Sequence, residues 1–259
     1  MFEEARYIQN SFSITFKRDS QIRRKANLFE DLLKEKLQGH YSQPQLIAIP
    51  DDFEPEIPRL IFSSSHGFSQ IIISQISMTL NVTYSPDWQI DISKGRDYLQ
   101  QRIQAMFSLL AKIDEIRPSF SGLVTRIQLT ANGSEEKFLR YMRERIHFEF
   151  IEDRLHDVMV KETTVHQDLF FNNLTVQNFR NWKPQQIMSD IPRYPRQAIT
   201  GKGIEIISDF NDRYAYNESS DYMSSATTGQ TIIETGLSLA DKVIAIQKLI
   251  VPFLTNWVL

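Results

Sequence analysis

The chain has 259 residues, of which 41% are hydrophobic and 24% charged, with a formal net charge of -3 and no cysteine. This composition predicts a globular protein with a sizeable core, and the lack of cysteine excludes disulfides, thiolate metal sites and a cysteine nucleophile. The small net charge gives no global reason to expect nucleic acid or an anionic membrane as the main partner.

Three features indicate where the protein resides. Glu3 and Glu4 occupy positions at which a signal peptide requires positive charge. No stretch approaches the roughly 18 uninterrupted apolar residues that a membrane-spanning helix needs. The missing cysteines suit a reducing compartment. We therefore expect a cytoplasmic protein that does not span or bind a membrane.

The first half of the chain predicts the order strand, helix, three strands, helix. Residues 11–16 alternate apolar and polar side chains, which is the period of a half-buried strand. Residues 22–37 and 99–113 carry apolar side chains every three or four positions, as amphipathic helices do. Between them, after an acidic connector that contains prolines, we expect a meander of three strands at residues 59–63, 68–75 and 77–84.

The same order begins again after Pro118. Residues 123–130 alternate like a strand, and residues 132–134 supply a turn and an N-cap before a helix whose first turn holds Glu135 and Glu136. A last helix is expected at residues 231–251. Three strands are expected between these helices, at residues 158–169, 174–182 and 203–210.

The repeated order predicts an α+β protein built from two βαβββα units, residues 1–117 and 118–259, which form antiparallel sheet with helices packed on one face. If both units share one sheet, they make a single continuous domain, and this alternative stays open. Residues 184–202 and 211–229 are expected to be exposed insertion loops. The order of elements is also similar to the saddle-shaped TATA-binding fold, as an analogy of topology that assigns no residue a role.

Basic and aromatic residues gather in residues 178–202, where Asp190 is the only acid. Arginine with interleaved aromatic rings suits contact with phosphates and bases, and it equally suits a contact with another protein. Ordinary solvation of an exposed loop is the leading alternative. The candidate partner-binding residues of this segment are Arg180, Trp182, Lys183, Arg193, Tyr194 and Arg196.

The C-terminal segment, residues 249–259, is mostly apolar and carries no charge. Apolar surface left in water costs about 25 cal/mol per Å², so we expect this segment to pack on its own chain or on a partner. Phe253 and Trp257 are its candidate partner-binding residues.

Imidazole and carboxylate are the transition-metal ligands that a chain without cysteine can offer. His156 with Asp157 and His166 with Asp168 are the most suggestive pairs, but their spacing does not match a HExxH helix. No GxSxG nucleophile elbow and no complete phosphate-binding loop are present in the sequence. We therefore expect no metal and no cofactor.

Two stretches carry a family resemblance: IPRLIFSSSHGFSQIIISQISMTLNVTYSPDW at residues 57–88, followed by an amphipathic helix, and GIEIISDF at residues 203–210, followed by an apolar helix. Together they resemble a sporadically distributed family of uncharacterised bacterial proteins of about 260 residues. The resemblance implies a bacterial or archaeal cytoplasmic protein, encoded on mobile or defence-related DNA. It carries over no functional residue.

These observations favour a non-enzymatic binding or adaptor protein that recognises another protein and self-associates. One alternative is a nucleic-acid-binding protein that uses residues 178–202. A second is a divergent metal-dependent hydrolase that uses His156, His166 and Asp168.

Overall fold

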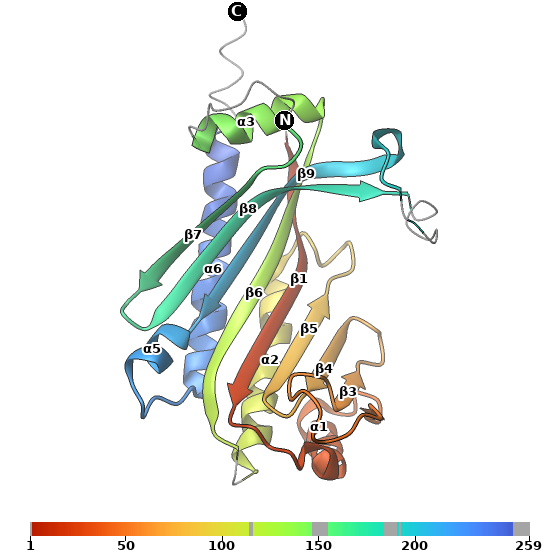
Figure 1. The fold of residues 1–259 in the computed structure, drawn as a ribbon, viewed down its shortest axis with the longest axis vertical. Coiled ribbons are helices and arrows are strands. Elements are labelled where there is room, and N and C mark those ends of the chain that lie inside the picture. Colours follow the sequence, from red (N-terminus) through yellow and green to blue (C-terminus); the bar gives the residue numbers. More distant parts are fainter. Residues whose placement is uncertain (1, 114–115, 147–154, 184–190, 192, 251–259) are drawn as a thin grey trace, which may run out of the picture.

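A single nine-stranded sheet backed by helices organises the chain (Figure 1). The computed structural model describes residues 2–113, 116–146, 155–183, 191 and 193–250. The strand order is β2-β3-β4-β5-β1-β6-β9-β8-β7, and each neighbouring pair is antiparallel. The fold class is therefore α+β, as the sequence predicts.

The N-terminal half contributes the strands β1 to β5. Its elements are β1 (Phe2–Phe16), the short 3-10 helix η1 (Ile22–Lys25), α1 (Ala26–Leu37), β2 (Gln45–Leu46), β3 (Leu60–Ser63), β4 (Ser69–Ile73), β5 (Ser77–Thr83) and α2 (Ile92–Ala111). β1 begins earlier than predicted, because a register shift between Tyr7 and Gln9 changes which residues face the core. Ala5 and Tyr7 are buried before it, and Asn10 and Phe12 after it. No single period of two therefore spans the strand.

The C-terminal half contributes the strands β6 to β9. Its elements are β6 (Pro118–Ala131), α3 (Glu135–Ile146), β7 (Met159–His166), β8 (Phe170–Trp182), η2 (Arg196–Ala198), β9 (Ile199–Asn211), α5 (Arg213–Glu218) and α6 (Ala226–Ile250). The tight turn between β7 and β8 was not predicted, since it contains neither glycine nor proline. Gln167 and Asp168 adopt positive φ angles of 54° and 52° there.

The two halves meet where β1 pairs with β6. The register runs from Phe2 opposite Ala131 to Phe16 opposite Pro118. A buried hydrogen bond crosses this pair, because Asn10 Nδ2 donates to Thr125 Oγ1 at 2.7 Å, while Asn10 Oδ1 has no hydrogen-bond partner among the described residues. The described strands of both halves therefore belong to one sheet.

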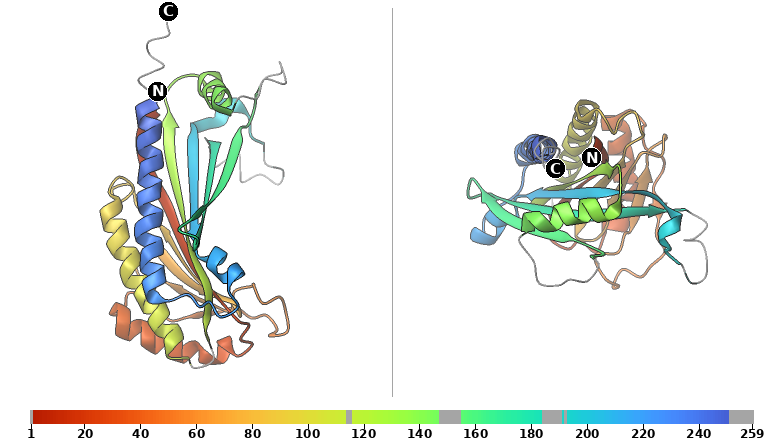
Figure 2. Two further views of the ribbon diagram at one scale, coloured as in Figure 1. Left: turned by 90° about the vertical axis from the view of Figure 1, so that its left-hand side faces the viewer. Right: turned by 90° about the horizontal axis from the view of Figure 1, so that it is seen from above.

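α2 and α6 lie side by side on one face of the sheet, with α1 beside α2 (Figures 1 and 2). The close approach of α6 to α2 needs a glycine, since a Cβ on Gly229 would lie 2.6 Å from the ring of Phe107. The core lies between these helices and the sheet, with Phe12, Leu80 and Ile206 almost wholly buried. Within the described ranges, no helix is long and apolar enough to cross a membrane.

α3 and α5 lie away from this helical layer. α3 crosses one end of the sheet, and α5 packs on the face opposite α6 (Figure 2). α5 is held there by ring contacts, from Tyr214 to Phe171 at 5.3 Å and from Tyr216 to Phe120 at 5.4 Å between centroids. The structure thus differs from the expectation of helices on one face, because these aromatic side chains of the sheet point away from the main core.

Asp212 joins three segments at the start of α5. Its carboxylate is buried, accepts from the Ser121 backbone N at 2.5 Å and accepts from Tyr222 Oη at 2.9 Å. Burial raises the pKa of Asp212 above its usual range, although the hydrogen bonds from Ser224, Ser121 and Tyr222 oppose the shift. This cluster ties the beginning of β6 to the end of β9 and to the segment before α6.

Two buried tyrosines near α2 provide a test of the core. Tyr84 is 5% exposed, and its hydroxyl has no hydrogen-bond partner among the described residues. Tyr41 is buried to the same extent, but its hydroxyl is 2.7 Å from Ser69 Oγ. Because an unmet buried hydroxyl costs roughly 1–3 kcal/mol, Tyr84→Phe should leave the free energy of unfolding unchanged or raise it by about 1 kcal/mol. Tyr41→Phe should lower it by about 1 kcal/mol.

Urea denaturation of both variants and the parent measures these differences. If Tyr84→Phe lost as much stability as Tyr41→Phe, the claim that the Tyr84 hydroxyl has no hydrogen-bond partner would be wrong.

Candidate functional site

The basic and aromatic segment does not form one surface. Arg180 and Trp182 lie at the end of β8, Arg196 lies in η2, and Lys183, Arg193 and Tyr194 lie in the connection between them. Trp182 is half-buried and contacts the ring of Tyr194, with 5.1 Å between the centroids. The structure separates these residues into an ion-paired group, which contains Arg180 and Arg196, and an exposed group without an ion pair to Glu135.

Arg180 is the buried member of the ion-paired group. Its side chain is 4% exposed, and its guanidinium is ion-paired with Glu135 of α3 and, at 2.7 Å, with Asp157 Oδ1. It also donates to the backbone oxygen of His156. Hydrogen bonds from Asn178 and Arg180 hold the pKa of Asp157 below its usual range. Arg180 therefore ties α3 and the segment before β7 onto β8.

Arg196 lies close to the same carboxylate. Its Nη2 is 3.4 Å from Glu135 Oε2, so two arginines flank a glutamate whose side chain is 9% exposed. Lys183, Arg193 and Tyr194 are exposed, and so is Arg196, whose side chain is 38% exposed. The other two candidates, Phe253 and Trp257, lie outside the described residues.

The histidine pairs do not assemble a metal centre. His156 Nε2 is 3.8 Å from Asp157 Oδ2, in a contact that two largely exposed side chains make. His166 packs its ring against Phe210, with 5.7 Å between centroids, and Asp168 lies in the turn after β7. Across the described ranges, no three histidine or carboxylate side chains are grouped closely enough to bind a metal ion. The hydrolase hypothesis gains no support from this geometry.

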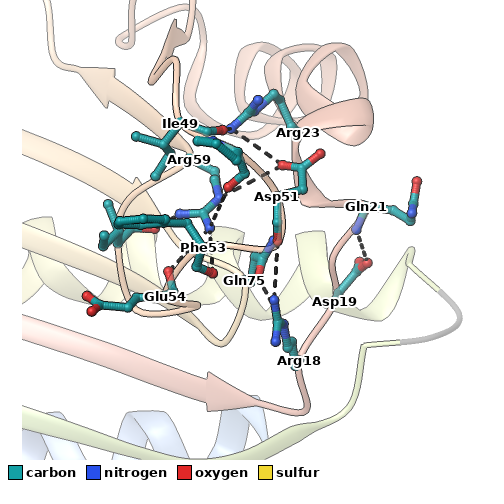
Figure 3. Close-up of polar contacts among 12 residues, drawn as sticks. Arg18, Asp19, Gln21, Arg23, Ile49, Asp51, Phe53, Glu54, Arg59 and Gln75 are labelled. Carbon is teal, nitrogen blue, oxygen red and sulfur yellow. Dashed lines mark hydrogen bonds and ion pairs between the residues drawn. The ribbon is translucent and has the colours of Figure 1, made fainter.

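Arg59 organises the connector between β2 and β3 (Figure 3). Its side chain is fully buried and donates to four backbone carbonyls, of which the closest is Ile57 O at 2.6 Å. Asp51 Oδ1 lies 4.0 Å from its Nε. Burial lowers the pKa of Arg59, and no aspartate or glutamate lies closer than Asp51 among its described partners. Both terminal nitrogens of the guanidinium donate to the protein's own backbone, and only Nε has no hydrogen-bond partner among the described residues, so the role of Arg59 is structural.

Neighbouring side chains fix the same connector from outside. Arg23 Nη2 is 3.4 Å from Asp51 Oδ1, and Gln75 Nε2 donates to the backbone oxygen of Asp51 at 2.7 Å (Figure 3). Arg18 Nη2 donates to that same oxygen at 3.2 Å. An acidic segment rich in proline, which the sequence predicts only as a connector, is thereby held in one conformation.

The sheet face opposite α6 carries short polar side chains. One row across it is formed, in strand order, by Ser63, Gln70, Asn81, Ser11, Val124, Asp209, Asn173 and Thr163. Several polar neighbours in this row bond to one another, since Ser11 Oγ donates to Asn81 Oδ1 at 2.7 Å and Asn173 Nδ2 donates to Asp209 Oδ2 at 3.2 Å. Such mutual satisfaction is typical of a hydrated face and gives no sign of a ligand site.

β7 is the most accessible of the long strands of the sheet. It lies at one edge and pairs only with β8 among the described strands (Figure 1). Every residue from Met159 to Val165 is exposed, and Met159 reaches 67%. The opposite edge, β2, has only two residues. A long accessible edge is a ready template for another strand.

The free edge of β7 presents the backbone groups of its odd-numbered residues. The backbone N of Asn178 donates to Val158 O at 3.2 Å, directly before the paired register of Met159 opposite Gln177. Hydrogen-bonded pairs alternate along an antiparallel ladder, so even-numbered residues point their N–H and C=O toward β8. Met159, Lys161, Thr163 and Val165 therefore point theirs away from the sheet.

Two of the usual protections of an edge strand, proline and a β-bulge, are missing from β7. Its sequence, MVKETTVH, contains no proline, and its pairing with β8 runs from Met159 to His166 without a register shift. Its only charged side chains at neutral pH are Lys161 and Glu162. The periodicity predicts the strand, but its position at an edge follows from long-range strand order, which has no local signal in the sequence.

Comparison with known proteins adds no assignment to these residues. No protein-family model and no curated protein matches the chain. The geometry of β7 is thus the main guide to a binding surface.

The ion pairs of Arg180 can be tested by charge removal. Arg180→Gln should lower the free energy of unfolding by about 2–4 kcal/mol, because among the described residues it leaves the buried Glu135 with Arg196 as its one ion-pair partner. Arg193→Gln removes an exposed charge from the same segment and should change stability by about 0.5 kcal/mol or less. Urea denaturation measures both values. Equal stability in the two variants would contradict a structural role for Arg180.

The buried guanidinium of Arg59 makes a second prediction. The ammonium group of lysine has three N–H donors and cannot bond all four carbonyls. Arg59→Lys should therefore lower the free energy of unfolding by about 2–4 kcal/mol. Arg18→Lys, on an exposed side chain of the same cluster, should cost about 1 kcal/mol or less. If thermal and urea denaturation show that Arg59→Lys is as stable as the parent, Arg59 does not hold the connector.

Proposed function

We propose that this protein is a non-enzymatic binding protein that self-associates by pairing the β7 edges of two copies. The observation that carries the proposal is an eight-residue edge strand that is exposed along almost its whole length and has no bulge or proline. Strand addition at such an edge is an established way for proteins to bind one another, with affinity supplied by backbone hydrogen bonds. A second copy is the favoured partner because the edge is complementary to itself.

The self-complementarity follows from the pattern of outward-pointing residues. In an antiparallel pair, the outward-pointing residues of one copy face the outward-pointing residues of the other. Since these residues all have odd numbers, the residue numbers of two facing residues add to an even sum, and the twofold axis (the dyad) passes through a residue of β7. A dyad at Lys161 or at Glu162 would place like charges directly opposite, which is unfavourable. A dyad at Thr163 places Lys161 opposite Val165 and Glu162 opposite Thr164 of the second copy. This register avoids charge repulsion and keeps most of the strand paired.

The size of the contact limits its strength. Two strands of eight residues bury less than the roughly 1,200 Å² at which specific stable interfaces begin. We therefore expect a weak, concentration-dependent dimer whose affinity lies in the micromolar range or above. The exposed side chains of Met159 and Val165 add apolar contact to the backbone ladder.

We further propose that the two halves are duplicated βαβββα units. The strand order β3-β4-β5-β1 in one half has its counterpart in β7-β8-β9-β6 in the other, which supports this interpretation. α1 and α3 each follow the first strand of their half, and α2 and α6 each follow the last. The halves differ by β2 and α5. The approximate dyad of this arrangement would pass between β1 and β6.

Nucleic-acid binding is a second candidate function. It is favoured by the exposed Lys183, Arg193 and Tyr194 and by the ring contact between Tyr194 and Trp182. Arg180 and Arg196 add less to it, because both lie against Glu135. Three exposed side chains make a small footprint, so this candidate ranks below strand addition.

Two lysine substitutions on adjacent residues of β7 test the self-association and its register. Thr163→Lys places two like charges across the proposed dyad and should raise the dimer dissociation constant by roughly threefold to tenfold. Thr164→Lys instead faces Glu162 of the second copy, and it should leave the constant unchanged or lower it by a similar factor. Both positions are exposed, so the fold should tolerate both changes. Sedimentation equilibrium over a range of concentrations gives the constants.

A cross-link supplies an independent readout, because the chain has no cysteine of its own. Thr163→Cys should form a disulfide-linked dimer under mild oxidation, whereas Thr164→Cys should do so much less, since its sulfurs are offset across the dyad. A parent protein that stays monomeric at every concentration, together with no cross-link at position 163, would overturn the proposal.

A further inference from the structure

A cavity lies between the C-terminal end of α1 and the middle of α2, on the helical side of the N-terminal half. It has a volume of about 450 Å³, which falls within the range of small-molecule sites. Its polar lining includes Lys36, His40, Gln101, Arg102, Gln104 and Ser108. α1 and α2 lie apart from β7 in the fold (Figure 1), so this cavity is separate from the proposed dimer edge.

Arg102 is the unusual member of this lining. It is 5% exposed, and its Nη1 donates to the backbone oxygen of Tyr98 at 3.2 Å. Its guanidinium carbon lies 3.2 Å from the centroid of the Tyr98 ring. Its Nε has no hydrogen-bond partner, and within the described residues no carboxylate forms an ion pair with it. Arginine keeps its charge when buried, so a cation lies in the wall of this cavity without a counter-ion.

The surroundings of the cavity leave its charge positive. Lys36 lines the cavity, and the nearby Glu35 lies outside the lining, 2.9 Å from Lys36 Nζ and 3.5 Å from Lys112 Nζ. The C-terminal end of α1 also faces this region, and a helix terminus of this kind carries about half a negative charge. That partial charge is smaller than the full charge of Arg102 alone. The balance favours an anion.

The rest of the lining indicates what the anion is attached to. Gln101 and Gln104 offer amide donors and acceptors, and Ser108 Oγ donates to the backbone oxygen of Gln104 at 2.8 Å. A ligand with polar groups can form hydrogen bonds with the exposed amides of Gln101 and Gln104, which a purely apolar molecule cannot do. A small molecule with a hydrogen-bonding body and one oxyanion group fits the lining best.

We propose that this cavity binds a small polar anion whose carboxylate or phosphate group pairs with the buried guanidinium of Arg102. Both groups accept two parallel hydrogen bonds from a guanidinium, so the residues favour oxyanions as a class. Lys36 then attracts the anion at the entrance. This site does not depend on the pairing of β7.

Calorimetric titration of the full chain tests the proposal with two simple probes, inorganic phosphate and acetate, at an ionic strength held constant with sodium chloride. Saturable binding of phosphate alone assigns a phosphate group to the ligand, and binding of acetate alone assigns a carboxylate. Arg102→Gln should weaken binding of the active probe by at least about tenfold. The absence of saturable binding with either probe overturns the proposal.

Two further variants separate the cavity from general charge effects. Gln104 lines the cavity from an exposed position, so Gln104→Trp should fill the cavity and abolish binding of the probe without loss of stability. If Arg102→Gln fails to fold, this variant tests whether the probe binds in the cavity. Arg140→Gln removes an exposed charge from α3 and should leave binding unchanged. If Gln104→Trp binds as the parent does, or if Arg140→Gln weakens binding as much as Arg102→Gln, the cavity is not the site.

Discussion

The antiparallel pairing of β1 with β6 is the constraint on which the rest of the structure depends. These are the longest strands of the sheet, with 15 and 14 residues, and they carry the buried hydrogen bond between Asn10 and Thr125. Their pairing makes one layer from both halves, so that α2 and α6 meet over its centre. It also places β2 and β7 at the outer edges. The accessibility of β7 is thus a consequence of how the sheet is joined in the middle.

Three buried arginines show how this fold handles charge away from water. Arg59 donates to backbone carbonyls of its own connector, and Arg180 pairs with two carboxylates. Arg102 contacts the ring and the backbone oxygen of Tyr98, and its charge and a hydrogen bond oppose the rise that burial causes in the pKa of Tyr41. It has no carboxylate partner within the described residues. A buried charge normally needs hydrogen bonds or a counter-ion. The contrast among the three is what makes the cavity beside Arg102 a candidate site, while the other two arginines are structural.

Local patterns predict much of this fold. The alternation at residues 11–16 and 123–130 predicts the central parts of β1 and β6, and the apolar spacing in the last part of the chain predicts α6. The pattern fails where geometry changes without a local signal. The bulge near Tyr7 hides the start of β1, and the turn at Gln167 and Asp168 lacks glycine and proline. The sequence therefore predicts whether a segment is a helix or a strand wherever the spacing of its apolar side chains stays constant along the segment.

The candidate sites depend on contacts that no local pattern encodes. Arg180 suggests an exposed phosphate contact in sequence, but its partner Glu135 lies 45 residues away along the chain. The cavity needs α1 and α2 side by side before Arg102 is buried, and the edge position of β7 needs the complete strand order. The residue types were visible in the sequence, whereas their surroundings were not.

Native-state hydrogen exchange, resolved by residue, tests most directly whether one joined sheet underlies the molecule. If β1 and β6 hold both halves together, their amides exchange only by global unfolding, and the slowest amides of β5 and β9 report the same free energy of opening. If the strands β6 to β9 instead open at a clearly lower free energy than β1 to β5, the halves are independent and the account is wrong.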